Sequence, residues 1–316
     1  MANEAQVFGA GRPKVWSIPP GADFLRVLAN TLAQETGLAD QPDALSDAII
    51  YVPNSRSARA LILALFDAAG GKPILPPDVR TLGDLESEEA PPNAETALAG
   101  LPPAMSPARR LGALASLVRG YYAARYRIDL PPASALAAAR ELSRLLDQAA
   151  LSENVDWSKL DGLVAESDLA AHWHGSVEFL KIITEAWPEW LDANNAMDPF
   201  ARRLAAAKAL AADWAARPPE APVVIAGSTG ATPAGRVLMK AALELPKGLI
   251  VLPGLDMDAD DSAWDAIRAS VSHPQNSLID ALDQMNVSPG EVGTWPGIPQ
   301  SAIDAARRRM IHEALA

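Results

Sequence analysis

The chain has 316 residues, of which 49% are hydrophobic, and this excludes wholesale disorder and predicts one large or two ordinary domains. The absence of cysteine excludes disulfides, thiolate zinc sites, iron–sulfur clusters and cysteine nucleophiles from these residues. The net charge of −12 indicates that the average surface repels nucleic acid, so any contact with DNA requires a local basic patch.

The chain carries no apolar run long enough to cross a bilayer, and no basic-then-apolar signal segment opens it. The expected location is therefore the cytoplasm, with no membrane partner.

Residues 1–105 are predicted to form the first part of an α/β core. Short strands are expected at 14–19, 48–54 and 72–85, and helices within 19–37 and 55–71. Asp23 is a plausible N-cap and Gly37 a helix stop, while Ser55 or Ser57 is expected to cap the second helix. The prolines of the third strand favour a sheet edge. Residues 86–105, acidic and with four prolines, are typical of a surface linker.

Residues 106–216 are predicted to be a helical insertion subdomain. The candidate helices are 107–125, 133–149, 156–165, 168–193 and 199–216.

Residues 217–316 are predicted to form the second part of the core, followed by C-terminal helices. A strand is expected at 223–226, a helix at 233–244 and a second strand at 248–254. The expected fold class is therefore α/β, with a parallel sheet that a large all-helical insertion interrupts.

The loop "AGSTG" between strand 223–226 and helix 233–244 admits an enzymatic interpretation. Ser228, Asp256 and His273 occur in the order of an α/β-hydrolase triad, with Ser228 as the nucleophile. Against this interpretation, Ala226 stands where the first glycine of a nucleophile elbow belongs.

The same loop resembles the Walker B segment of UvrD/Rep-type helicases, a strand that ends in "DEFQDTNP". Ala226 and Gly227 align with the Asp that orients Mg²⁺ and with the catalytic Glu, and Thr229 aligns with the Gln. The turn at Gly21 and Ala22 occupies the P-loop position, but no Lys follows the glycine. The resemblance implies a P-loop NTPase sheet of the UvrD type with a degenerate nucleotide site. We expect the strands that precede Gly21 and Gly227 to be adjacent.

Several longer motifs resemble the N-terminal region of the AddB family in its alphaproteobacterial form. They are "SIPPGADFL", "AIIYVPNSRSARAL", "RTLGDL", "HWHGSVEFLKIITEAWPEWL", "MDPFARR", "VVIAGSTGATPAG" and "GLIVLPGLDMDADDSAW". AddB is a subunit of the AddAB helicase–nuclease that processes DNA double-strand breaks. The resemblance implies an AddA-type motor and nuclease partner, DNA as a ligand, and a chain that corresponds to one motor-like lobe.

The resemblance also implies where the chemistry lies. The iron–sulfur cluster and Mg²⁺ of the family belong to a C-terminal nuclease part, so no cofactor, no metal site and no catalytic residue are expected here. Phosphoryl transfer needs a Lys at the phosphates and acids at Mg²⁺, and both are missing. The expected function is that of an inactivated, helicase-like lobe.

The expected DNA contacts lie after the strand that ends at Val52. "VPNSRSARAL" resembles a DNA-contacting helicase motif, and "RTLGDL" resembles a second one that includes Thr81. Asn54, Ser55, Arg56 and Arg59 supply amide, hydroxyl and guanidinium donors at a strand–helix junction. The alternative is that the arginines only solubilise a helix.

Residues 106–128 are a second basic segment, in which arginines alternate with Tyr121, Tyr122 and Tyr126 and no acid occurs. Such side chains can stack bases, although tyrosines at this spacing often only pack. A protein that docks the motor subunit without touching DNA is a further alternative.

Overall fold

The computed structural model describes residues 7–9, 11–82, 95–152, 155, 157, 170–298, 306, 309, 310, 312 and 313. The chain divides into two compact units. One consists of Met1–Leu85 with Ala207–Ala316, and the other is Glu86–Ala206. The dividing point falls inside helix α9 (Pro199–Ala216), ten residues before the boundary that the sequence predicted at 216.

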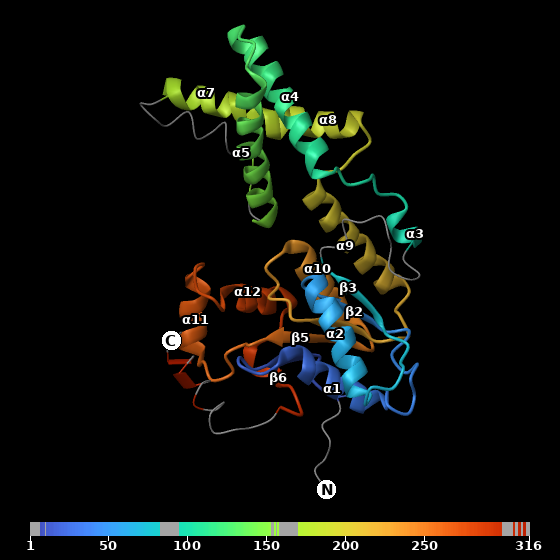
Figure 1. Ribbon diagram of the computed structural model, residues 1–316. Helices are drawn as coiled ribbons and strands as arrows, with labels where there is room; N and C mark the ends of the chain where they lie inside the picture. The colour runs from blue at the N-terminus through green and yellow to red at the C-terminus, as the bar shows by residue number, and fades with distance from the viewer. Residues whose placement is uncertain are drawn as a thin grey trace. The chain divides into compact units, whose positions relative to one another are not determined.

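The first unit contains a parallel sheet, so the α/β prediction is confirmed (Figure 1). The strands are β1 (Val15–Ile18), β2 (Ile49–Val52), β3 (Asp78–Thr81), β4 (Val223–Ala226), β5 (Gly248–Pro253) and β6 (Gly293–Thr294). Their order is β3-β2-β4-β5-β1-β6, and every neighbouring pair is parallel. Strand β3 lies at the edge, as its prolines predicted. Residues 15–52 and 223–253 contribute to one continuous sheet.

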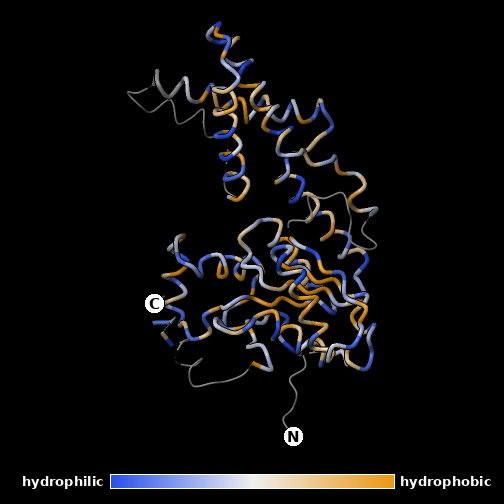
Figure 2. The backbone as a smooth tube through the Cα atoms, in the orientation of Figure 1, coloured by the Kyte–Doolittle hydropathy of each residue, from blue (hydrophilic) through white to orange (hydrophobic). Residues whose placement is uncertain are grey.

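The central strands β1, β2 and β4 are buried along their whole length because both faces of the sheet are covered, and they are apolar except for Ser17, whose hydroxyl accepts from the Leu255 amide. Helices α1 (Phe24–Thr36) and α2 (Ser55–Ala68) pack on the face that carries Trp16, Ile50 and Val224. On the opposite face, α10 (Pro233–Glu244) contacts β4 and β5, and Tyr51 packs edge-on against Trp214. Figure 2 shows the strands as a hydrophobic band inside this unit.

The expected adjacency of the strands before Gly21 and Gly227 is wrong. Strand β5 lies between β1 and β4, because β1 pairs with β5 and β4 pairs with β5 on its other side. The unit is completed by α11 (Asp261–Ala269), the 3₁₀ turn η4 (Pro289–Glu291) and α12 (Asn276–Met285), which packs on α10.

In the described part of the second unit, helices surround a separate apolar core. The elements are α3 (Glu95–Leu98), α4 (Pro107–Tyr126), α5 (Pro132–Leu151), α7 (Ala170–Lys181), the π-helix η3 (Ile182–Ala186), α8 (Trp187–Ala193) and the first half of α9. The helix predicted at 168–193 is confirmed over its described residues, from 170 on, and it widens into a π-helix in its middle. Pro188 has no amide hydrogen and its ring crowds the carbonyl of Thr184, which accounts for the widened turn.

Arg110 of α4 is a buried cation in this helical core. Its side chain is 7% exposed, and its Nε donates to Asp198 at 2.8 Å. One terminal nitrogen donates to Asp147 at 2.6 Å and to Ser143 at 3.0 Å. Burial raises the pKa of Asp198, and the nearby Arg110 opposes that shift.

The predicted helix 156–165, apart from Trp157, and residues 86–94 of the predicted linker lie outside the described residues, as does most of the last predicted helix. The rest of the linker, 95–105, includes helix α3 and buries Leu98 and Met105, so the surface-linker prediction is wrong for this part. Among the helices that the structure describes, none has the length and apolarity needed to cross a membrane.

Candidate functional site

The carboxyl ends of β1, β2, β4 and β5 lie at one edge of the sheet because these strands are parallel. A Cβ placed on Gly227, after β4, would lie 3.4 Å from the ring of Phe24 and 3.5 Å from Pro53. A Cβ on Gly254, after β5, would lie 3.5 Å from Pro20. The structure therefore gathers the loops of the predicted nucleotide site and of the predicted DNA junction.

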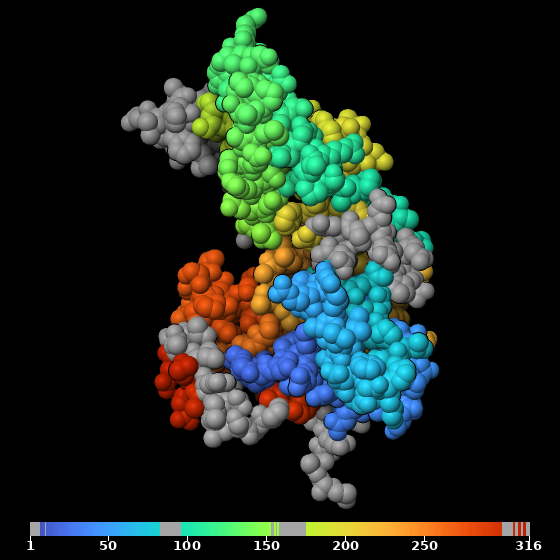
Figure 3. All heavy atoms as spheres, in the orientation of Figure 1, coloured from blue at the N-terminus to red at the C-terminus, as the bar shows by residue number. Residues whose placement is uncertain are grey.

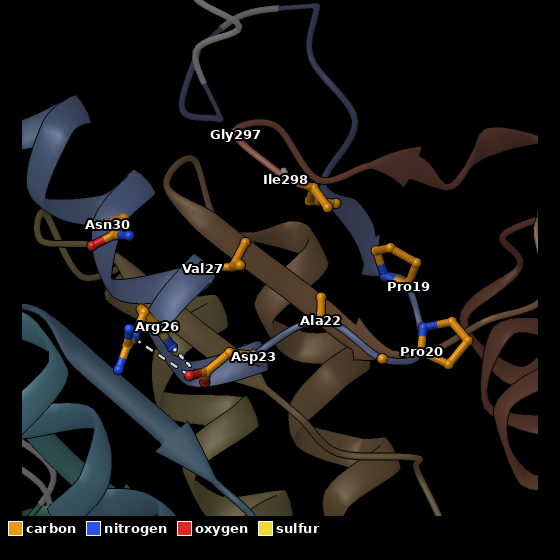
Figure 4. Close-up of a pocket in the computed structure, with 10 residues that line it drawn as sticks. Pro19, Pro20, Ala22, Asp23, Arg26, Val27, Asn30, Gly297 and Ile298 are labelled. Carbon is orange, nitrogen blue, oxygen red and sulfur yellow. Dashed lines mark hydrogen bonds and ion pairs between the residues drawn. The ribbon is translucent and has the colours of Figure 1, made fainter. Parts of the chain in front are cut away.

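The loop at Gly21 and Ala22 leads into α1, whose first turn is capped by the side chain of Asp23. Gly21 has a φ of 90°, a value that favours glycine. Asp23 is the N-cap, as predicted, and its Oδ1 accepts from the Arg26 amide at 3.3 Å (Figure 4). The guanidinium of Arg26 lies 3.4 Å from Asp23 Oδ2. The carboxylate of Asp23 thus caps this helix terminus.

A cavity of about 240 Å³ lies beside this turn. Figure 4 shows its lining, which is Pro19, Pro20, Gly21, Ala22, Asp23, Arg26, Val27, Asn30, Gly297 and Ile298. The lining contains no lysine, and its one cation, Arg26, is paired with Asp23.

The loop after β4 is built by internal hydrogen bonds. Ala226 is fully buried and Gly227 has a φ of 76°. Ser228 is buried, and its hydroxyl accepts from the Gly230 amide at 3.1 Å. Thr229 is half-buried, and neither it nor the rest of the loop supplies a carboxylate.

Arg236 and Gly230 hold this loop, and the sequence analysis missed both. Arg236 is buried on α10 and donates to the Gly230 carbonyl at 2.6 Å. Gly230 has a φ of 69°, and a Cβ there would lie 2.4 Å from the Cβ of Ala281 on α12. Only glycine fits this close approach of loop and helix.

Gly230→Ala is expected to lower the free energy of unfolding by about 2–4 kcal/mol, since backbone strain and overpacking add. Urea unfolding followed by circular dichroism measures the change. The matched control is Gly21→Ala, which has a similar φ but open space around the added methyl, and should cost about 1–2 kcal/mol. Equal costs for the two variants would contradict the packing argument.

The first turn of α2 presents the predicted DNA-contacting residues to solvent. Asn54, rather than the predicted Ser55 or Ser57, is the N-cap, and its Oδ1 accepts from the Ser57 amide at 3.0 Å. Ser55, Arg56 and Arg59 are exposed. Arg59 Nε donates to the Ser55 carbonyl at 3.4 Å, whereas the side chain of Arg56 has no hydrogen bond or ion pair with any residue that the structure describes. Both guanidinium groups can therefore bind an anionic ligand.

Thr81 differs from these residues because it is buried, with 6% of its surface exposed. It pairs with Val52 in the sheet. A buried hydroxyl does not reach a DNA strand at the protein surface, so Thr81 is not part of the candidate DNA-contacting set.

Asp256 and His273 make contacts that differ from those of a Ser–His–Asp hydrolase triad. Nδ1 of His273 accepts from the Gln275 amide at 3.1 Å, so it carries no proton for a carboxylate to orient. Asp256 instead contacts Nδ1 of His312 at 2.8 Å, which raises the pKa of that imidazole. These contacts disfavour the hydrolase alternative.

The acidic loop after β5 serves to start a helix. Asp260 is the N-cap of α11, and the backbone hydrogen bond from Ala263 lowers the pKa of its carboxyl. Within the described ranges, no group of three or more histidine or acidic side chains is arranged to hold a metal ion.

No family model matches the chain, and a search of curated proteins finds no match.

Proposed function

We propose that this chain is an inactivated helicase-like lobe that holds single-stranded DNA at the start of α2. One observation carries the proposal. Arg56 and Arg59 extend into solvent at the carboxyl edge of the sheet, and neither has an acidic partner within the described chain. In a protein with a net charge of −12, such a site supplies the local positive charge that DNA binding requires.

The proposed sheet type is that of P-loop NTPases related to UvrD, without the ability to hydrolyse ATP. Two features of the loops support the absence of ATP hydrolysis. Asp23 places a carboxylate at the first turn of α1, which repels phosphate. Ala226 and Gly227 offer no ligand to Mg²⁺ at the end of β4.

On this proposal the chain corresponds to the motor-like lobe of an AddB-type subunit in double-strand break repair. Its partners are then single-stranded DNA and an AddA-type motor subunit, and its location is the cytoplasm. The iron–sulfur cluster and Mg²⁺ of such a complex belong to other parts of the assembly.

We expect the protein to bind ATP no more tightly than a dissociation constant of about 1 mM and to release no phosphate. Fluorescence anisotropy with a labelled ATP analogue and a phosphate-release assay with and without single-stranded DNA measure these properties. DNA-stimulated phosphate release that disappears in Gly21→Phe or Gly227→Phe would overturn the proposal.

A scaffold that docks a partner protein is the second candidate. It is favoured by the apolar side chains on the outer surface of α2, where Leu63 is 66% and Phe66 is 42% exposed. Loss of binding to the AddA-type subunit in Leu63→Ser with Phe66→Ser, together with unchanged DNA binding in Arg56→Ala with Arg59→Ala, would favour this candidate.

A further inference from the structure

The turn between α4 and α5 combines exposed arginines with an aromatic cluster. Tyr126 ends α4 and is 49% exposed. The turn that follows it begins with Arg127, and both Arg125 and Arg127 are exposed. In Figures 1 and 3 this end of the hairpin projects beyond helix α7 of the same unit.

Tyr126 is supported from behind by other rings. Its ring centroid lies 5.6 Å from that of Tyr122, with an interplanar angle of 43°, and 6.0 Å from that of Tyr121. Phe179 of α7 packs edge-on against Tyr121 at 5.5 Å. The ring of Tyr126 is thus held in place by its contacts on one side while half of its surface faces water. A ring that is already ordered loses little conformational entropy when a base stacks on it.

The charges at this turn are predominantly positive. Arg125 and Arg127 make no side-chain hydrogen bond or ion pair with any part of the chain that the structure describes. The acid nearest in sequence, Asp129, is paired with Arg119 at 2.7 Å. Glu178, which faces the cluster from α7, is paired with Lys181 at 3.0 Å.

The backbone adds to the presentation of these cations. Arg127 has a φ of 55°, in the left-handed region that residues other than glycine seldom adopt. Its amide donates to the Ala123 carbonyl and closes the helix. Glycine and asparagine are the usual residues at such a C-cap, so an arginine here adds backbone strain.

From these features we infer that the α4–α5 turn is a binding site for single-stranded nucleic acid, with Tyr126 as the stacking platform and Arg125 and Arg127 as phosphate ligands. Single strands fit this chemistry because their bases are free to stack, whereas duplex bases are already stacked inside the helix. The inference does not rest on the proposed contact at Asn54–Arg59, since it concerns residues of the helical unit only.

The test is fluorescence anisotropy of the whole chain with a labelled oligothymidylate of about 12 nucleotides, and with an abasic strand of equal length. Tyr126→Ala is expected to weaken binding of the oligothymidylate about tenfold and to leave binding of the abasic strand unchanged. Tyr126→Trp should bind as the native protein does. Tyr126→Leu, which keeps an apolar contact to Tyr122 but lacks a flat ring, should bind as Tyr126→Ala does.

Phosphate binding is tested separately with Arg125→Gln and Arg127→Asn together, because asparagine tolerates the left-handed backbone. This pair should weaken the binding of both strands and reduce the slope of log affinity against log salt by about 1.4. All variants are compared in the native chain and in a chain that also carries Arg56→Ala and Arg59→Ala, so that failure of one site is distinguished from failure of the other.

The inference is overturned if folded Tyr126→Ala and Tyr126→Leu bind the oligothymidylate as the native chain does. It is also overturned if these variants lose affinity for the oligothymidylate and for the abasic strand equally, or if neither strand binds measurably.

Discussion

Replacing Arg110 with leucine is expected to lower the free energy of unfolding by about 3–5 kcal/mol, because the change leaves a buried carboxylate without its cation. The Nε of Arg110 donates to Asp198 at 2.8 Å, and the two side chains are only 7% and 12% exposed. Urea unfolding monitored by circular dichroism measures the loss. The matched control on the same helix is Arg119→Leu, whose partner Asp129 is 87% exposed, and it should cost about 0–1 kcal/mol.

The cost of Arg110→Leu should also depend on pH. Burial raises the pKa of Asp198 and Arg110 opposes the shift, so without Arg110 the pKa rises further. A carboxyl whose pKa is raised in the folded state binds more protons folded than unfolded, and its contribution to stability falls as the pH rises towards the folded pKa. The variant should therefore lose less stability below about pH 4 than near neutral pH. A loss that is independent of pH would contradict the assignment of Arg110 as the counter-ion of Asp198.

Arg56→Ala combined with Arg59→Ala is expected to weaken binding of single-stranded DNA about a hundredfold or more, since each of the two charge-assisted contacts contributes roughly 1.5–3 kcal/mol. For two phosphate contacts, the slope of log affinity against log salt should decrease by about 1.4. The measurement is a salt titration of oligonucleotide binding, and sequences of different composition should be affected alike because phosphates carry no sequence information.

Two controls accompany this pair. Arg26→Ala removes an arginine at the same sheet edge that is already paired with Asp23, and Asp258→Asn alters the exposed acidic loop. Neither should reduce affinity. If the double variant binds and responds to salt as the native protein does while remaining folded, the start of α2 is only a solubilised helix, and the docking scaffold becomes the better account.

Much of the fold could be predicted because it is local. The apolar runs at β2, β4 and β5, the Asp23 cap and the Gly37 stop each depend on neighbours in sequence. Where several residues could serve the same role locally, the prediction was wrong. Asn54, Ser55 and Ser57 can all cap a helix, and the extended backbone of Asn54 selects it.

What depends on distant packing could not be predicted. Strand β6 has only two residues, Gly293 and Thr294, and it exists because it pairs with β1. The roles of Arg236 and Gly230 depend on the contact of the β4 loop with α12, and that of Arg110 on acids 37 and 88 residues away. The identity of a single residue does not indicate a partner that is distant in the sequence.

The most direct test of the proposed DNA contact is cross-linking from the first turn of α2. Because the chain has no cysteine, Ser55→Cys gives one site for a thiol-linked photoreactive group, and Ser55 is exposed. The control is Asp47→Cys, an exposed position before β2 at the opposite edge of the sheet, where loss of a negative charge favours DNA and makes the comparison stringent. The account predicts that a single-stranded oligonucleotide cross-links to the label at position 55 and that salt or unlabelled strand abolishes the product. Equal cross-linking from both positions, or none from position 55, would contradict it.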